Sequence, residues 1–261
     1  MAAKTQKALL CVSFGTSVPK ARNNVEAVEN ALGAAAPDRD FVRAFTSPTI
    51  RRILAERGET VLSLEEALQD LADRGYTDIV VQPTHLLFGV EYDKIAATVR
   101  SFEGTFSALA LGRPLLAGQE DLDALAGILS ERFPAELGTA YVLFGHGTSH
   151  YANLTYPALQ TVFSLRARPD VLIGTVEGWP GLEEVRDELW QQTVDHVHLV
   201  PLMLVNGDHV MNDLNGSGED SWRTALEQDG YRVTCHDAGL GMDPAVQDLY
   251  RKHLEELLAR G

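Results

Sequence analysis

Short apolar runs recur along the chain, separated by segments in which apolar and polar residues follow helical spacing. The runs are too short for helices, and most of them end near a glycine, a proline or a small polar residue. Continuous apolar runs bounded by such residues are typical of buried strands in parallel sheets. Predicted strands lie at 7–13, 40–45, 78–82, 106–111, 140–144, 170–176, 194–200 and 231–236.

The segments between these runs are predicted to be helices. Val25, Val28 and Leu32 recur at the spacing of an amphipathic helix. Ser63 followed by Glu66 has the pattern of a capping box, which marks the start of a helix. Strands that alternate with helices indicate parallel sheets with right-handed crossovers. Predicted helices lie at 19–36, 48–56, 62–74, 91–102, 121–132, 154–165, 181–191, 221–228 and 244–259.

The second half of the chain repeats the first. Phe14 in one copy corresponds to His146 in the other, and both precede Gly-Thr-Ser. Repetition at a nearly fixed offset indicates an internal duplication. We therefore expect an α/β protein with two similar domains, at 1–136 and 137–242, each with a four-stranded parallel sheet flanked by helices. The aligned segments are 14–17 with 146–149, 42–46 with 173–177, and 81–89 with 199–207.

Composition limits the classes of function. A chain of 261 residues allows one large domain or two smaller ones, and a hydrophobic content of 45% provides material for a sizeable core. The net charge of −15 argues against general nucleic-acid binding, which needs a basic face. The N-terminus has no apolar signal region and no run is long enough to span a membrane, so we expect a cytoplasmic protein. Cys11 and Cys235 are expected to be reduced core residues.

Ionisable residues follow three predicted strands of the second half. His146 follows the first, Glu177 the second, and His209 the third. Ligands of open parallel sheets bind beyond the carboxyl ends of the strands, so we expect these side chains at one rim. Two imidazoles and a carboxylate suit Co²⁺, Ni²⁺, Fe²⁺ or Zn²⁺. The same groups can also transfer protons near neutral pH.

The first half is expected to form the opposite wall of a cleft. Its positions matching the three ionisable residues hold Phe14, Thr46 and Glu91. His85 follows the third strand of this half, and two interpretations stay open: it lines the cleft, or it is a hydrogen-bonded loop residue.

Each candidate also has a structural interpretation. His146 lies in a glycine-flanked turn, and Glu177 precedes a predicted helix whose dipole favours a carboxylate. His209 is placed to cap a following helix. Their joint position at three strand ends of one sheet favours the functional interpretation. His196 and His198 alternate with apolar residues along a strand and are expected to be structural.

Nucleotide-binding patterns are absent from the sequence. The segment Gly145-His-Gly147 lacks the third glycine of a dinucleotide fingerprint, and no glycine turn is followed by a P-loop lysine. Neither Ser13 nor Ser149 lies in a nucleophile elbow. The sequence therefore favours neither a nucleotide-dependent enzyme nor a serine hydrolase.

Taken together, these motifs resemble a known family. They resemble the anaerobic cobaltochelatases (CbiK type) of early-insertion cobalamin biosynthesis, members of the ferrochelatase-like class II chelatases. The resemblance covers nearly the whole chain, and the motifs are specific in combination. They are Phe14-Gly-Thr-Ser17, Phe45-Thr-Ser47, His85, Gly89-Val-Glu-Tyr92, Gly145-His-Gly147, Val176-Glu177, Pro201-Leu-Met-Leu204, Gly207-Asp-His209, Asn212-Asp213 and Asp220-Ser-Trp222.

The resemblance implies ATP-independent insertion of Co²⁺, the substrate metal, into the tetrapyrrole sirohydrochlorin. It implies two flavodoxin-like domains with the tetrapyrrole between them, and a terminal helix at 243–260 that packs back on the first domain. The family's metal-binding histidines correspond to His146 and His209, and its catalytic glutamate to Glu177. Because the metal ligands must be deprotonated, activity is expected to fall below about pH 6.

With such a substrate, the first domain is expected to pack against the macrocycle. A ferrochelatase or nickelochelatase acting on the same tetrapyrrole, or a non-catalytic tetrapyrrole or metal carrier, remains an alternative. The sequence leaves the oligomeric state open, a homo-oligomer included. The expected substrate-binding residues are Ser13, Phe14, Thr16, Thr46, His85, Phe88, Gly89 and Tyr92.

Overall fold

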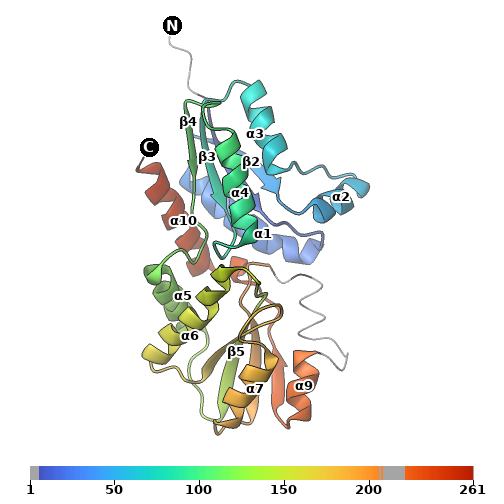
Figure 1. Ribbon diagram of the computed structural model, residues 1–261, viewed down its shortest axis with the longest axis vertical. Coiled ribbons are helices and arrows are strands. Elements are labelled where there is room, and N and C mark those ends of the chain that lie inside the picture. The colour runs from blue at the N-terminus through green and yellow to red at the C-terminus, as the bar shows by residue number, and fades with distance from the viewer. Residues whose placement is uncertain (1–5, 206, 208–220, 261) are drawn as a thin grey trace. The chain divides into compact units, whose positions relative to one another are not determined.

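The expected duplication is present as two parallel sheets with the same strand order. The computed structural model describes residues 6–205, 207 and 221–260. Over these residues the chain divides into unit 1, Met1–Ala117 with Gly241–Gly261, and unit 2, Gly118–Leu240. Each unit contains, in its described part, a four-stranded sheet with helices on both faces (Figure 1). No described helix is both long and apolar enough to cross a membrane.

Unit 1 has the strand order β2-β1-β3-β4. Alternate residues of β1 point to opposite faces, so Ala8, Leu10 and Val12 pack with α3 and α4 in one core. Leu9 and Cys11, also fully buried, point to the face where α1 and α10 contact each other. The elements are β1 (Lys7–Ser13), α1 (Pro19–Ala35), β2 (Asp40–Phe45), α2 (Pro48–Glu56), α3 (Leu64–Asp73), β3 (Asp78–Pro83), α4 (Val90–Ser101), β4 (Ala108–Leu111) and α10 (Pro244–Leu258).

Unit 2 has the strand order β6-β5-β7-β8. Val142 and Phe144 of β5 pack with α7 and α9, where Trp222 meets Phe144 edge to face. On the other face α5 contacts α6. The elements are α5 (Gln119–Arg132), β5 (Thr139–Gly145), the 3₁₀ turn η1 (Tyr151–Leu154), α6 (Thr155–Leu165), β6 (Val171–Thr175), α7 (Leu182–Trp190), β7 (His196–Pro201), α9 (Trp222–Gln228) and β8 (Arg232–Cys235); a further 3₁₀ turn, η2 (Leu240–Met242), follows.

Local signals for helix starts are present as expected. The Ser63 side chain accepts from the Glu66 backbone, and the Glu66 side chain accepts from the Ser63 backbone. Pro157 does not interrupt its helix, because α6 begins at Thr155 and the proline lies in the first turn. A first-turn backbone N–H has no partner inside the helix, so proline costs nothing there.

The boundary between the units differs from the one expected at residue 136. Helix α5 belongs to unit 2, which begins at Gly118. Arg166 at the end of α6 donates to the Asp123 carboxylate on α5 over 2.9 Å. The Arg168 guanidinium donates to the carbonyl oxygens of Ser130 and Phe133 at the end of α5. These bonds tie α5 to the connection between α6 and β6 in unit 2, whereas α10 belongs to unit 1.

His196 and His198 of β7 pack against each other and against His236, which follows the neighbouring strand β8. His198 Nδ1 lies 2.9 Å from His236 Nε2, and His196 Nε2 lies 2.8 Å from Thr234 Oγ1. The rings of His196 and His198 have centroids 4.2 Å apart. Burial, followed by the charges of the neighbouring histidines, lowers the pKa of His198 to about 4. These contacts agree with the structural role expected for His196 and His198.

The His198 side chain is expected to make stability depend on pH. An unfolded histidine has a pKa near 6.5, so between about pH 6.5 and pH 4 the unfolded chain binds a proton that folded His198 does not. Stability therefore falls as the pH falls through this window. We expect His198→Asn, whose amide keeps a hydrogen-bonding group near Nδ1, to lose less unfolding free energy than wild type between about pH 7 and pH 5. Urea titrations measure this, and equal losses would contradict it.

Candidate metal and substrate site

His146 occupies the turn directly after β5. Its side chain is 59% exposed. The preceding strand is fully buried, and the next residue, Gly147, has a φ of +79°. This left-handed conformation is readily adopted only by glycine. It turns the chain sharply at the strand end and leaves the imidazole at the carboxyl edge of the sheet.

Glu177 lies beside His146 at the same sheet edge. Its Oε2 is 3.6 Å from His146 Nδ1, and its side chain is 67% exposed. The backbone brings the two together, because Val176 N donates to Gly145 O over 3.1 Å and Glu177 N donates to His146 O over 2.8 Å. The parallel pairing of β5 with β6 thus continues past both strands. One donor nitrogen and one carboxylate face solvent within reach of a single ion.

Glycines make this approach of the two turns feasible. A Cβ on Gly147 would lie 2.5 Å from the backbone nitrogen of Gly178 and 2.8 Å from Thr175 Cβ. A Cβ on Gly178 would lie 2.2 Å from Asn153 Oδ1. Side chains at these two positions would push the turns apart. The turn bearing His146 and the turn bearing Glu177 therefore pack backbone against backbone.

The third expected ligand, His209, lies outside the described residues. Within 6–205, 207 and 221–260, no group of three or more histidine, cysteine, aspartate or glutamate side chains is arranged to hold a metal ion. The described part of the site is therefore the His146–Glu177 pair at the end of β5 and β6. The third strand that we expected to contribute, β7, ends at Pro201, eight residues before His209 in the sequence.

In unit 1, the carboxyl edge of the sheet carries the first group of expected substrate residues. Phe14, the counterpart of His146, is 51% exposed. Ser13 is buried and its hydroxyl accepts from Thr84 Oγ1 over 2.8 Å, so it supports the turn from within the unit. Thr16 is also buried, and its hydroxyl accepts from Val18 N. Thr46 is half-buried, and its N–H donates to Ser13 O.

One correction concerns the counterpart of Glu177 in unit 1. The sequence alignment matched it with Thr46. In the structure Ser47 N donates to Phe14 O, as Glu177 N donates to His146 O. Thr46 instead corresponds to Val176, since each donates to the last residue of the first strand. Ser47 is the N-cap of α2 and accepts from Ile50 N, so this position in unit 1 starts a helix instead of presenting a carboxylate.

The segment after β3 carries the second group of expected substrate residues. Phe88 and Tyr92 meet edge to face with ring centroids 4.8 Å apart, on either side of half-buried Gly89. The Tyr92 hydroxyl donates to Gly112 O over 3.1 Å. Both ring nitrogens of His85 are buried without a hydrogen-bond partner among the described residues. Burial lowers the His85 pKa to about 4, so its imidazole is neutral near pH 7.

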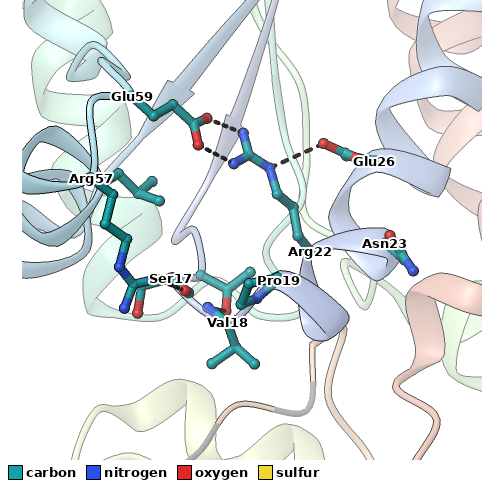
Figure 2. Close-up of a pocket in the computed structure, with 10 residues that line it drawn as sticks. Ser17, Val18, Pro19, Arg22, Asn23, Glu26, Arg57 and Glu59 are labelled. Carbon is teal, nitrogen blue, oxygen red and sulfur yellow. Dashed lines mark hydrogen bonds and ion pairs between the residues drawn. The ribbon is translucent and has the colours of Figure 1, made fainter.

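A cavity of about 310 Å³ lies beside the Thr16–Ser17 turn of unit 1. Figure 2 shows the Arg22 guanidinium bound to Glu59 and to Glu26, and all three residues line this cavity. Arg57 donates to the Ser17 carbonyl over 2.5 Å and so holds the same turn. Sequence reasoning did not identify these contacts. They support the turn that bears the expected substrate residues.

Comparisons with known proteins agree with this architecture. The profile of the family described as cobalt chelatase (CbiK) matches residues 7–259. A sirohydrochlorin cobaltochelatase of Salmonella typhimurium is 40% identical over 256 residues, covering 97% of both chains. The sirohydrochlorin cobaltochelatase CbiKC of Nitratidesulfovibrio vulgaris is 33% identical over 254 residues, covering 96% of this chain and 90% of that one.

A solved structure shares the fold. SirB from Bacillus subtilis with Fe³⁺ has a TM-score of 0.68 at 17% identity, covering 98% of this chain and 97% of that chain. At this identity the likeness concerns the fold alone. The two relatives and the family profile span nearly the whole sequence, both units included. On these grounds the chain belongs to the cobalt chelatase (CbiK) family.

Proposed function

We propose that this protein is a sirohydrochlorin cobaltochelatase, which inserts Co²⁺ into sirohydrochlorin to give cobalt-sirohydrochlorin for cobalamin biosynthesis. The observation that carries the proposal is the pair of His146 and Glu177, exposed and 3.6 Å apart at the carboxyl edge of one parallel sheet. Membership of the cobalt chelatase family supports it, as do full-length relatives named sirohydrochlorin cobaltochelatase.

The chemistry of the pair suits metal insertion. A free tetrapyrrole must lose two N–H protons as one divalent ion enters, so charge is balanced by two protons released. His146 holds the partly hydrated ion through a neutral nitrogen, and Glu177 supplies a carboxylate that binds the ion or accepts a ring proton. We propose His209 as the third ligand. Without thiolates, the site binds Co²⁺ with moderate affinity, which allows the ion to be passed on.

The rim of unit 1 is proposed to bind the macrocycle. Exposed Phe14 and the Phe88–Tyr92 pair offer aromatic surface for a flat ring. His85 is also proposed to bind the ring; because both of its ring nitrogens are buried and have no partner among the described residues, they can reach the ring only if the segment after β3 shifts. Gly89 follows Phe88 in the sequence, and a Cβ there would meet nothing within 4 Å, so this position has open space beside it. Thr16 and Thr46 are proposed to contribute through the backbone of their turns.

Two further properties belong to the proposal. The reaction is proposed to need no ATP, because formation of the metal–nitrogen bonds of the product provides its driving force, and the sequence has no phosphate-binding motif. We also place the protein in the cytoplasm, in keeping with the two free cysteines, Cys11 and Cys235.

Purified protein tests the proposal directly. It is incubated anaerobically with excess sirohydrochlorin and Co²⁺, without nucleotide, and the absorption change on metallation is followed. We expect many product molecules per protein and a rate well above that of the blank. Binding at one equivalent without turnover would instead establish a carrier. Parallel assays with Fe²⁺ and Ni²⁺ in competition test the choice of metal, and a preference for either would assign a different chelatase.

A further inference from the structure

Asn153 connects the two turns that bear His146 and Glu177. It lies in η1, after the first turn along the chain, and is half-buried. Its Oδ1 accepts from Thr148 N over 3.1 Å, and its Nδ2 donates to Trp179 O over 2.6 Å. Thr148 and Trp179 each lie two residues beyond the functional side chain of their turn. One amide thus holds both turns.

The side chain of Asn153 fits the space that the glycines leave. A Cβ on Gly178 would lie only 2.2 Å from Asn153 Oδ1, so the amide oxygen occupies space that any larger residue at this position would need. Asn153 therefore packs against the bare α-carbon of Gly178 while its two hydrogen bonds flank it. A substituent on Gly178 or loss of the amide would each change the spacing of the turns.

Packing of the functional side chains cannot set their separation, because they are 59% and 67% exposed. Their relative position depends on the backbone of the two turns. The strand-like bonds from Val176 N and Glu177 N fix the start of the second turn, and Asn153 fixes its continuation. Metal sites and reacting groups need positions held to about 0.5 Å.

We infer that Asn153 is a positioning residue that sets the distance between His146 and Glu177 for binding Co²⁺ and for inserting it. The inference rests on the proposed function, and names a residue that acts through both ligands without touching the ion. Loss of groups that orient metal ligands commonly lowers metal affinity or activity by about 10–100-fold.

Gln160 provides a matched control. It is half-buried on α6 of the same unit. Its amide donates to Val171 O over 2.8 Å and accepts from Ile173 N over 2.7 Å. Gln160→Ala therefore removes the same kind and number of bonds as Asn153→Ala, but from the strand β6 instead of the two turns. Both variants are expected to lower the melting temperature by a similar amount.

The experiment measures Co²⁺ affinity without tetrapyrrole, the visible spectrum of bound Co²⁺, and kcat for insertion. We expect Asn153→Ala, and more mildly Asn153→Ser, to weaken Co²⁺ binding and lower kcat by about 10–100-fold. We also expect the Co²⁺ spectrum of Asn153→Ala to resemble that of Glu177→Gln. Gln160→Ala should retain wild-type affinity, spectrum and kcat.

The contrary results are distinct. If both asparagine variants keep wild-type Co²⁺ affinity, spectrum and kcat, Asn153 is only structural and the inference is wrong. If the asparagine and glutamine variants lose affinity equally, general destabilisation is the cause and the inference is again wrong. If wild type binds Co²⁺ but inserts none, the proposed function fails, while the affinity and the spectrum still test Asn153.

Discussion

Replacing Glu177 by glutamine is expected to lower kcat for cobalt insertion by about 10²–10⁴-fold, the usual contribution of a positioned acid or base. The substitution keeps the shape of the side chain but removes its negative charge and its capacity to accept a proton. Because the side chain is 67% exposed and lies 3.6 Å from His146, the fold does not depend on it. The unfolding free energy should change by less than about 0.5 kcal/mol. Steady-state insertion kinetics and urea titrations measure both quantities.

Glu183 is the control for that substitution. It lies on α7 just after the Glu177 turn, is 78% exposed and pairs with Arg186 over 2.9 Å. Glu183→Gln removes the same charge from the same unit and should keep the wild-type kcat. Equal kcat values in Glu177→Gln and wild type would show that the carboxylate takes no part in insertion.

Substituting Gly147 by alanine is expected to damage both fold and activity. The φ of +79° disfavours an L-residue by about 1–2 kcal/mol. The added Cβ would also lie 2.5 Å from Gly178 N, and overpacking of this kind costs about 1–3 kcal/mol. We expect a loss of about 2–5 kcal/mol in unfolding free energy. Since the turns must separate, we also expect a roughly 100-fold lower kcat from the misplaced His146 and Glu177.

The substitution Gly230→Ala separates the cost of a positive φ from the cost of overpacking. The φ of Gly230 is +97° and a Cβ there would meet nothing within 4 Å. Gly230→Ala in the same unit should therefore show only the conformational cost of about 1–2 kcal/mol, with the wild-type kcat. If Gly147→Ala were no more destabilising than Gly230→Ala and equally active, the close packing of the two turns would be irrelevant to the site.

The positions of His146 and Glu177 could be predicted because strand ends have strong local signals. An apolar run that stops at a glycine turn marks the carboxyl end of a buried strand. Parallel pairing then places the ends of neighbouring strands at one edge whatever their separation in sequence. β1 was expected at 7–13 and is Lys7–Ser13, and His146 follows β5 directly.

The assignment of α5 to a unit could not be made from the sequence. Amphipathic spacing shows that a helix buries one face, but not which sheet covers it. The answer depends on contacts with α6, such as the Arg166–Asp123 pair at 2.9 Å. The residue-by-residue alignment of β2 with β6, its counterpart in the second unit, presents a similar difficulty. Short apolar strands align almost equally well when shifted by one residue, and only the hydrogen bonds of Ser47 and Glu177 distinguish the two.

Asn153 had no sequence signal either. An asparagine between apolar residues resembles any polar residue of a helix start. Its proposed role depends on Trp179, which lies 26 residues away in the sequence and is brought near by the pairing of β5 with β6. The positioning role that we propose for Asn153 is thus harder to predict than the proposed ligands, because one of its partners is a backbone atom 26 residues away.

The two units carry different side chains at equivalent positions beyond their first two strands. Phe14 and His146 occupy equivalent turns, and Gly15 and Gly147 both have positive φ. Ser47 starts a helix where Glu177 projects into solvent. The same backbone therefore supports exposed Phe14 in unit 1 and, in unit 2, the His146–Glu177 pair that we propose binds the metal.

A double-mutant cycle on initial rates of cobalt insertion tests most directly the claim that His146 and Glu177 act together on one ion. The rates of wild type, His146→Ala, Glu177→Gln and the double variant are compared. Residues that act as a unit have strongly non-additive effects. The proposal predicts that the double variant is within about threefold of the slower single variant. A double-variant rate equal to the product of the two separate losses would contradict it.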